Sequence, residues 1–393
     1  MTTPFQPNRR AFLLGASTTL LFAGCASAQA DLSGRKMIVV VARGGMDGLS
    51  AAVPYGDRNY AALREALAIP PPGAPGGVLK LDGTFGLHPS LDVMHGLARG
   101  GEMRFAPAVA IPDRQRSHFE AQDVLESGAS RLYGSTSGWM NRALAAMGSN
   151  KGLSVGSQVP LILRGPARAG SWAPGGAPAR NDRIATVLQD LYKDDPLLGP
   201  ALASGLATEA MAEAASGGGA LRRTDVKAIG DAVGKLMIQP GGADLVALSL
   251  DGFDTHARQG ASTGLLAKRL DLMDGLHEGL KQGLGPTWSK TVVVTVTEFG
   301  RTARANGTGG TDHGTASTAF LAGGALRKGG LVGDWPSLAA NRLFEGRDLA
   351  PTLDVRSLFK GVLRDHMGVD RAALDSRVFE NSAEARPVEN LVV

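Results

Sequence analysis

Residues 37–48 read MIVVVARGGMDG, a run of β-branched and other apolar side chains that stops at a polar, glycine-rich turn. A strand with one face in water alternates apolar and polar residues, but this run offers no polar position to solvent. It therefore predicts a strand covered on both faces, as in a parallel sheet between layers of helices. The glycines that follow permit a tight turn and a close backbone approach at the end of the strand.

The same pattern returns along the chain at residues 105–111, 245–250 and 291–296, each followed by a polar segment. Apolar residues at three- and four-residue spacing predict helices between these strands. These helical segments are residues 117–127, 182–192, 265–284 and 353–367. Alternating strands and helices predict an α/β fold, a three-layer sandwich with a mostly parallel central sheet.

The N-terminal segment carries a targeting signal. Residues 8–14, NRRAFLL, resemble the twin-arginine export motif, and residues 26–28, ASA, offer a small-x-small cleavage site. We therefore expect residues 1–28 to be a twin-arginine signal peptide and the mature chain to be periplasmic or secreted. The alternative is a lipoprotein anchored at Cys25, because residues 21–25, LFAGC, form an imperfect lipoprotein box.

The mature part, residues 31–393, is expected to form a single domain, with a helical cap at about residues 181–240. We expect no transmembrane span in it. The formal charge of +4 comes from dispersed basic residues, so a nucleic-acid partner is not supported. With one cysteine in the whole chain, Cys25, the mature protein forms no disulfide within itself and depends on its core for stability.

Polar side chains that could hold a metal ion follow the expected strands. Asp312 and His313 are adjacent in a glycine-rich stretch, and Asp254 and His256 follow the strand at residues 245–250. Carboxylates and imidazoles are ligands for hard and borderline divalent ions. Ligands bind beyond the carboxyl ends of strands in open α/β sheets, so we expect one cleft to receive both pairs. A surface turn is the alternative for Asp254 and His256.

Other polar residues at these strand ends have two interpretations each. Asp47 is either a metal ligand in a glycine turn or the N-cap of the next helix. Ser117 opens a helix, where exposed amides would favour a nucleophile, but Ser117 and Glu120 also have the spacing of a capping box. Glu298 and Arg301 form either a structural ion pair, or a supporting acid and a guanidinium that binds an oxyanion.

These motifs, in this order, resemble the bacterial family known as domain of unknown function 1501, over nearly the whole mature chain. The resemblance is carried by residues 44–49, 53–55, 87–89, 116–123, 138–139, 254–256, 298–302 and 312–314. That family is in turn similar to the alkaline phosphatase and sulfatase superfamily. The resemblance implies an alkaline-phosphatase-like fold, with Asp47, Asp312 and His313 on one ion, Asp254 and His256 on another, and Ser117 as nucleophile. A final histidine ligand is not evident downstream, where only His366 remains.

On this basis we expect an exported metal-dependent hydrolase of phosphate or sulfate esters, using a divalent ion such as Zn, Mn, Mg or Ca. Ser117 would attack the ester, and Arg301 would steady the substrate oxyanion. The substrate would be a small-molecule or glycan ester. The alternative is a catalytically degenerate protein of the cell envelope that uses the same cleft to bind a glycan or a protein partner.

Overall fold

The computed structural model describes residues 32–149, 151–156, 158–175, 182–196, 198–215, 221–222 and 224–393. Gly34–Val393 form one compact unit. The other unit, Met1–Ser33, falls almost wholly outside the described part, and so do the expected signal peptide and Cys25. Within the described part, no helix combines the length and the apolar character that a membrane span needs.

The centre of the fold is an eight-stranded sheet with the order β11-β5-β10-β9-β1-β8-β6-β7. Strand β10 runs antiparallel to both of its neighbours, and the other strand pairs in this sheet are parallel. The strands are β1 (Lys36–Ala42), β5 (Met103–Ala110), β6 (Gly152–Val155), β7 (Ala169–Trp172), β8 (Leu245–Leu250), β9 (Thr291–Val296), β10 (Ser317–Ala322) and β11 (Leu353–Asp354). The expectation of a mostly parallel sheet is confirmed.

Strand β1 shows why its sequence lacks polar positions. Its odd-numbered residues Met37, Val39 and Val41 belong to one hydrophobic core, and the even-numbered residues from Ile38 to Ala42 belong to a second. From Met37 to Ala42, each is at most 4% exposed. Both faces of the strand are therefore covered, as the unbroken apolar run predicts.

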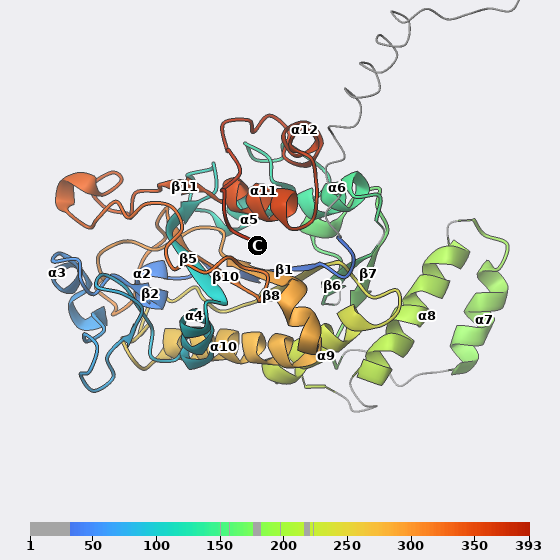
Figure 1. Ribbon diagram of the computed structural model, residues 1–393, viewed down its shortest axis with the longest axis horizontal. Helices are drawn as coiled ribbons and strands as arrows, with labels where there is room; N and C mark the ends of the chain where they lie inside the picture. Colours follow the sequence, from blue (N-terminus) through green and yellow to red (C-terminus); the bar gives the residue numbers. More distant parts are fainter. Residues whose placement is uncertain are drawn as a thin grey trace, which may run out of the picture. The chain divides into compact units, whose positions relative to one another are not determined.

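Helices cover both faces of the sheet, which gives the three layers expected from the sequence (Figure 1). One face carries α5 (His118–Ser127), α6 (Trp139–Ala146) and α11 (Val355–Asp365). The other face carries α4 (Asp92–Gly100), α9 (Val226–Ile238) and α10 (Leu265–Leu284). The helices expected at residues 117–127, 265–284 and 353–367 are thus present, each with its ends within two residues of the expected ones.

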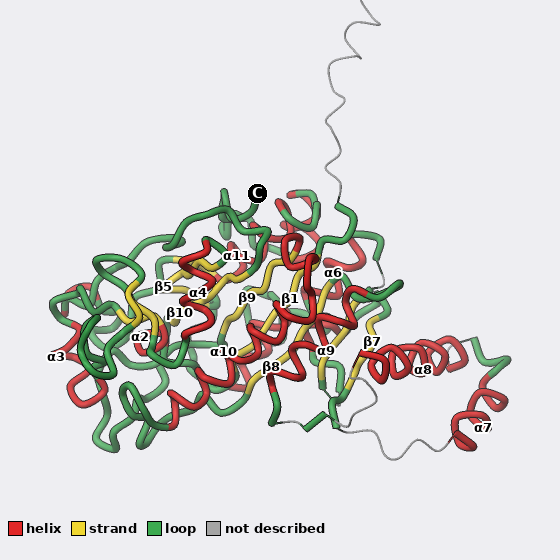
Figure 2. The backbone as a smooth tube through the Cα atoms, turned by 60° about the horizontal axis from the view of Figure 1, so that its bottom comes forward, coloured by secondary structure: helices red, strands yellow, loops and turns green. Residues whose placement is uncertain are grey.

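Helices also fill most of the region expected to form a cap. Helices α7 (Asp182–Tyr192) and α8 (Leu198–Ala215) lie beyond the end of the sheet, where α8 contacts β7 (Figure 2). Helix α9, in contrast, packs along α10 as part of a sandwich layer. This packing is close: a Cβ added at Gly279 would lie 2.0 Å from the carbonyl oxygen of Lys227.

Small elements complete the chain around the sandwich. A second sheet has three short strands in the order β2-β4-β3, namely β2 (Ala52–Val53), β3 (Leu79–Lys80) and β4 (Gly86–Leu87). Further short helices are α2 (Gly48–Ala51), α3 (Tyr60–Arg64) and α12 (Arg371–Ala373). The segment that contains α2 and α3 supplies hydrogen-bond partners of Asp47.

Candidate metal centre

The candidate site lies at the carboxyl ends of three neighbouring strands. Strands β8, β1 and β9 lie side by side and run parallel, so their carboxyl ends meet at the same edge of the sheet. Strand β1 leads into the turn at residues 43–47, β8 into the loop at residues 251–256, and β9 into Glu298 and Arg301. The structure therefore brings the polar segments together where ligands bind in open α/β sheets.

Two histidine rings and one carboxylate converge at this edge of the sheet. The Nε2 atoms of His256 and His313 lie 2.9 Å apart. The Oδ1 atom of Asp254 is 3.0 Å from His256 Nε2 and 3.3 Å from His313 Nε2. Neutral imidazole nitrogens that face one another with a carboxylate beside them form a donor set suited to a borderline divalent ion.

His118, the first residue of α5, adds a third imidazole. Single ligand atoms of His118, Asp254 and His313 all lie within 4.8 Å of one another. The Nε2 atom of His118 is 3.4 Å from Asp254 Oδ2. It is buried and has no hydrogen-bond partner within the described part of the chain, which is consistent with a nitrogen reserved for a bound ion.

Each of these three histidines is oriented through its other ring nitrogen. The Nδ1 atom of His118 is 2.8 Å from Glu298 Oε1, and that of His313 is 2.9 Å from the carbonyl oxygen of Arg116. The Nδ1 atom of His256 is 3.4 Å from Asp312 Oδ1. Metal-binding histidines typically use the second nitrogen in this way, with a carboxylate or a carbonyl as acceptor. The arrangement turns all three Nε2 atoms inward.

Glu298 is fully buried behind His118. Its Oε1 atom also accepts from the backbone amide of Gly44 at 2.8 Å, and Oε2 accepts from the hydroxyl of Thr297 at 3.0 Å. Burial works to raise the pKa of Glu298, but the hydrogen bonds from His118 and from backbone amides hold it below its usual value. The Glu298 hydrogen bond in turn raises the pKa of His118. Glu298 is thus an ionised partner that fixes the His118 ring.

Arg301 lies beneath Asp254 rather than in open contact with the cleft. It is 1% exposed, and its Nη2 atom donates to Asp254 Oδ1 at 2.5 Å. The Nε atom donates to the carbonyl oxygen of Gly45 at 2.6 Å, and Nη1 donates to that of Thr311 at 3.2 Å. Burial would raise the pKa of Asp254, but this guanidinium holds it below the usual range. The geometry supports a role in orienting Asp254 and gives no support to direct contact with a substrate oxyanion.

Asp312 also lies outside the group of Nε2 atoms that surrounds Asp254. Its side chain is 55% exposed, and Oδ1 accepts from Asn306 Nδ2 at 3.0 Å while facing His256 Nδ1. The sequence predicts Asp312 to be a metal ligand. In the structure its carboxylate faces the His256 ring instead, where it would orient that candidate ligand. Its neighbour His313 does reach the centre, so adjacent residues in the sequence have different places in the site.

Asp47 belongs to a separate buried network. It is 1% exposed, and its Oδ2 atom accepts from the guanidinium of Arg64, from Ser50 Oγ at 2.9 Å and from Gln259 Nε2 at 2.6 Å. Arg64 is fully buried and pairs with this carboxylate. An expected metal ligand is therefore neutralised by a guanidinium, and we do not place Asp47 in the candidate ligand set. It occupies the N-cap position of α2 without a side-chain capping bond.

Ser117 lies between two residues that touch the site. The carbonyl of the preceding residue, Arg116, meets His313, and the following residue is His118. Ser117 is the N-cap residue of α5, but its side chain makes no capping hydrogen bond. The capping-box interpretation is therefore wrong. Arg116 has a φ of +61°, an unfavourable conformation for a residue with a Cβ that is typical of functional sites.

The sequence interpretation missed His118. His118 lies between Ser117 and Glu120, which have the spacing of a capping box. This spacing indicates a helix start and gives His118 no role of its own. A usable signal was available: a histidine at the first turn of a helix that follows a strand-like run. His366, the remaining candidate for a late ligand, lies elsewhere, with Nε2 3.0 Å from the carbonyl oxygen of Lys36 at the start of β1.

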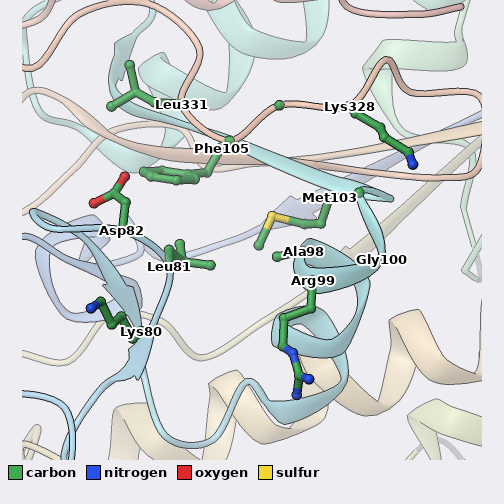
Figure 3. A pocket seen from close by; sticks show the side chains of 13 residues that line it. Lys80, Leu81, Asp82, Ala98, Arg99, Gly100, Met103, Phe105, Lys328 and Leu331 are labelled. Atoms are coloured by element: carbon green, nitrogen blue, oxygen red, sulfur yellow. The ribbon is translucent and has the colours of Figure 1, made fainter.

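A further cavity has no part in this centre. It has a volume of about 460 Å³ and lies at the first residues of β5, where Met103 and Phe105 form part of its wall together with Leu81 (Figure 3). Strand β5 runs in the same direction as β9, because β10 is antiparallel to both. The start of β5 is therefore at the sheet edge opposite to the one that carries the candidate ligands.

Comparison with known proteins places the chain in a family. Residues 102–380 match the profile of the family described as "Protein of unknown function (DUF1501)". The chain belongs to the DUF1501 family. The resemblance expected from the sequence motifs is thereby confirmed. Among curated proteins, none matches this DUF1501 chain in sequence.

Solved structures that are similar to the DUF1501 chain share little sequence with it. The C-terminal periplasmic domain of EcEptC from Escherichia coli, in complex with Zn, has 11% identity and a TM-score of 0.37, covering 73% of this chain and 72% of that one. A protein in the alkaline phosphatase superfamily from Vibrio parahaemolyticus has 8% identity and a TM-score of 0.39, covering 76% and 62%. The phosphonate monoester hydrolase of Agrobacterium radiobacter has 10% identity and a TM-score of 0.36, covering 86% and 74%. Similarity this low carries no argument about the site, which rests on this chain's own residues.

Proposed function

We propose that this protein is an exported metal-dependent hydrolase of phosphate or sulfate esters. Its centre would be a divalent ion held by His118, Asp254, His256 and His313. One observation carries the proposal: three Nε2 atoms face a single carboxylate, while all three Nδ1 atoms are engaged by protein acceptors. A purely structural hydrogen-bond network would not need all three histidine rings to point their Nε2 atoms toward the same carboxylate.

The chemistry of the donors fits a divalent ion. Three imidazoles and one carboxylate are a set that suits zinc better than magnesium or calcium, which prefer oxygen ligands throughout. Supporting contacts to Glu298, Asp312 and the Arg116 carbonyl match the outer shell that orients metal ligands. The donors gather around one point, so the proposal is for a single ion rather than the pair that the resemblance implies.

A divalent ion bound here would polarise the ester and favour ionisation of a nearby nucleophile. The nucleophile we propose is the hydroxyl of Ser117, which follows a residue in contact with His313. Its Oγ would bond to phosphorus or sulfur while the bond to the alcohol breaks, and the serine proton would pass to the departing alkoxide. Water would then cleave the serine ester, restoring the hydroxyl and releasing phosphate or sulfate. Glu298 and Arg301 would keep His118 and Asp254 in place throughout.

A binding protein without catalysis is the second candidate, and one observation favours it. The carboxylate of Asp254 already receives a buried guanidinium, with Arg301 Nη2 at 2.5 Å from Oδ1. A fixed positive charge beside a ligand weakens the attraction of that site for a cation. If the ion binds weakly, the same cleft would serve to hold a glycan or an envelope protein.

Hydrolysis of 4-nitrophenyl phosphate and 4-nitrophenyl sulfate by the purified mature chain separates these candidates. We expect turnover that stops on treatment with a chelator and returns with zinc. Ser117→Ala should abolish turnover and keep the bound metal, whereas His313→Ala should lose both. His95→Ala is the matched control, since His95 lies on α4 and its Nε2 contacts the Lys80 carbonyl. If the wild-type chain binds zinc but hydrolyses neither ester, the binding-protein function is favoured instead.

A further inference from the structure

A second cavity opens beside the candidate metal centre. It has a volume of about 590 Å³, which is within the range of small-molecule sites. Its walls come from the ends of β1, β6 and β8, from one side of α5, and from the segment at residues 158–164. Helix α5 joins it to the centre, because α5 begins with His118 and its Gln122 Nε2 lies 3.4 Å from Glu298 Oε1. The cavity and the candidate centre thus share helix α5 as a common wall element.

Two exposed aromatic side chains stand at this cavity. Phe119 is 89% exposed and Tyr133 is 77% exposed. Within the described part of the chain, they are the aromatic residues among the exposed large hydrophobic side chains, and both line this one cavity. Exposed single apolar residues are ordinary, but two aromatic rings at one polar cavity indicate a binding surface.

The backbone holds Tyr133 in an unfavourable conformation. Its φ is +53°, which is unusual for a bulky residue, and its amide donates to Asp123 Oδ1 at 2.8 Å. Asp123 belongs to α5 and also lines the cavity. Strain of this kind persists when surrounding contacts fix it, and it gathers at ligand sites. The backbone of Tyr133 is therefore anchored to the same helix that carries Phe119.

The charges that line the cavity are largely balanced. Arg43 pairs with Glu126 at 2.5 Å, and the other oxygen of Glu126 accepts from the Ile162 amide at 3.2 Å. Arg164 and Asp123, which also line the cavity, carry opposite charges, and Arg164 Nε donates to the carbonyl oxygen of Val159 at 2.9 Å. A site for a polyanion would present unpaired cations along its length. This lining, with amides of Gln122 and Gln158 among the aromatic rings, suits an uncharged ligand that is rich in hydroxyl groups.

We propose that this cavity is a saccharide-binding subsite, in which Phe119 and Tyr133 stack on sugar rings of an oligosaccharide whose ester group reaches the metal centre. The negative face of an aromatic ring attracts the slightly positive C–H groups of a sugar face, and neighbouring amides and carboxylates bond its hydroxyls. The inference rests on the proposed hydrolase function for the ester, but the subsite can be tested without it.

The test is binding of unesterified hexasaccharides of glucose, mannose, galactose and N-acetylglucosamine to the mature chain after removal of metal. Saturation-transfer NMR identifies binding, and calorimetry measures its strength. We expect at least one of these sugars to bind, and Phe119→Ala and Tyr133→Ala each to weaken it about tenfold. Phe119→Trp and Tyr133→Phe keep an aromatic face and should retain binding. Leu191→Ala, which removes an exposed apolar side chain on α7, is the control.

The inference is overturned if none of the four sugars binds, or if binding survives both alanine variants. The outcome is independent of catalysis. Sugar binding without ester hydrolysis would support the subsite and contradict the hydrolase. Hydrolysis of nitrophenyl esters without sugar binding would support the hydrolase and contradict the subsite.

Discussion

The Nε2 atoms of His256 and His313 lie 2.9 Å apart, although the two residues are separated by 57 positions in the chain. His256 follows β8, and His313 precedes β10, so two different strands bring them together. Asp254 lies beside both rings, and His118 joins Asp254 and His313 within 4.8 Å. The convergence of these side chains is what makes a metal centre the function to test.

Glu298 should control metal affinity without touching the ion. In Glu298→Gln the acceptor of the His118 ring becomes neutral, so the ring loses both its fixed orientation and part of its basicity. We expect zinc affinity to fall about 10- to 100-fold, as measured by competition with a chelating dye. Glu278→Gln is the matched control, because Glu278 pairs with Lys227 on the surface of α10. Equal affinities in the two variants would remove Glu298 from the proposed role.

Arg64 should be essential to stability rather than to metal binding. In Arg64→Leu the buried carboxylate of Asp47 loses its guanidinium partner, which leaves an uncompensated charge in the core. We expect the free energy of unfolding in urea to fall by about 3–5 kcal/mol. The double variant with Asp47→Asn should recover part of this loss. Asp47→Asn alone should bind zinc as tightly as the wild type, and a large loss of affinity would restore Asp47 as a ligand.

The contact between α9 and α10 requires specific glycines. In Gly279→Ala the new methyl group would lie 2.0 Å from the Lys227 carbonyl oxygen, so the helices must separate. We expect a loss of about 1–3 kcal/mol in the free energy of unfolding. Gly275→Ala, on the same helix, places its methyl group 3.8 Å from the Lys227 side chain. It should instead stabilise the protein by about 0.5–1 kcal/mol through helix propensity, and equal effects at both positions would contradict the packing.

His366 should make the fold sensitive to acid. Burial lowers its pKa to about 4, and the nearby Arg35 charge acts in the same direction. Between this value and the usual 6.5, the unfolded chain binds a proton that the folded protein does not, so stability is lost as the pH falls through this window. The contribution is at most about 3 kcal/mol. In His366→Gln the unfolding free energy should change less between pH 7 and pH 5 than in the wild type; an equal change would contradict the prediction.

The surroundings of His366 differ from what its position in the sequence indicates. A histidine near the end of a helix is expected to be a cation that complements the helix dipole. The ring is buried at the C-cap of α11 and is held neutral, with Nε2 against the Lys36 carbonyl. Helix position can be predicted from sequence, but burial by a distant strand cannot.

The layers of the fold were predictable because β1, β8 and β9 are continuous apolar runs. Strand β10 was not predicted: its sequence, STAFLA, has few β-branched residues, and nothing in it indicates that it runs against its neighbours. Direction depends on the connections before and after a strand. Those connections are loops here, whose paths are set by packing.

The candidate site was predictable in part because apolar runs identify the strands that precede it. Asp254 and His256 directly follow a strand, so the edge of the sheet fixes their neighbourhood. Sequence alone does not single out His118, because a capping-box spacing gives its segment a local explanation. It also does not pair Asp47 with Arg64, which lies 17 residues away in another helix. Pairing of a buried carboxylate with one particular arginine is a property of the tertiary structure.

Calorimetric titration of Zn²⁺ into the mature chain, after treatment with a chelator, tests whether the metal centre exists. We expect a single tight site in the wild type, lost in His118→Ala, His256→Ala and His313→Ala and retained in His95→Ala. Zinc binding that is absent from the wild type, or that persists in all three site variants, would contradict the proposed metal centre.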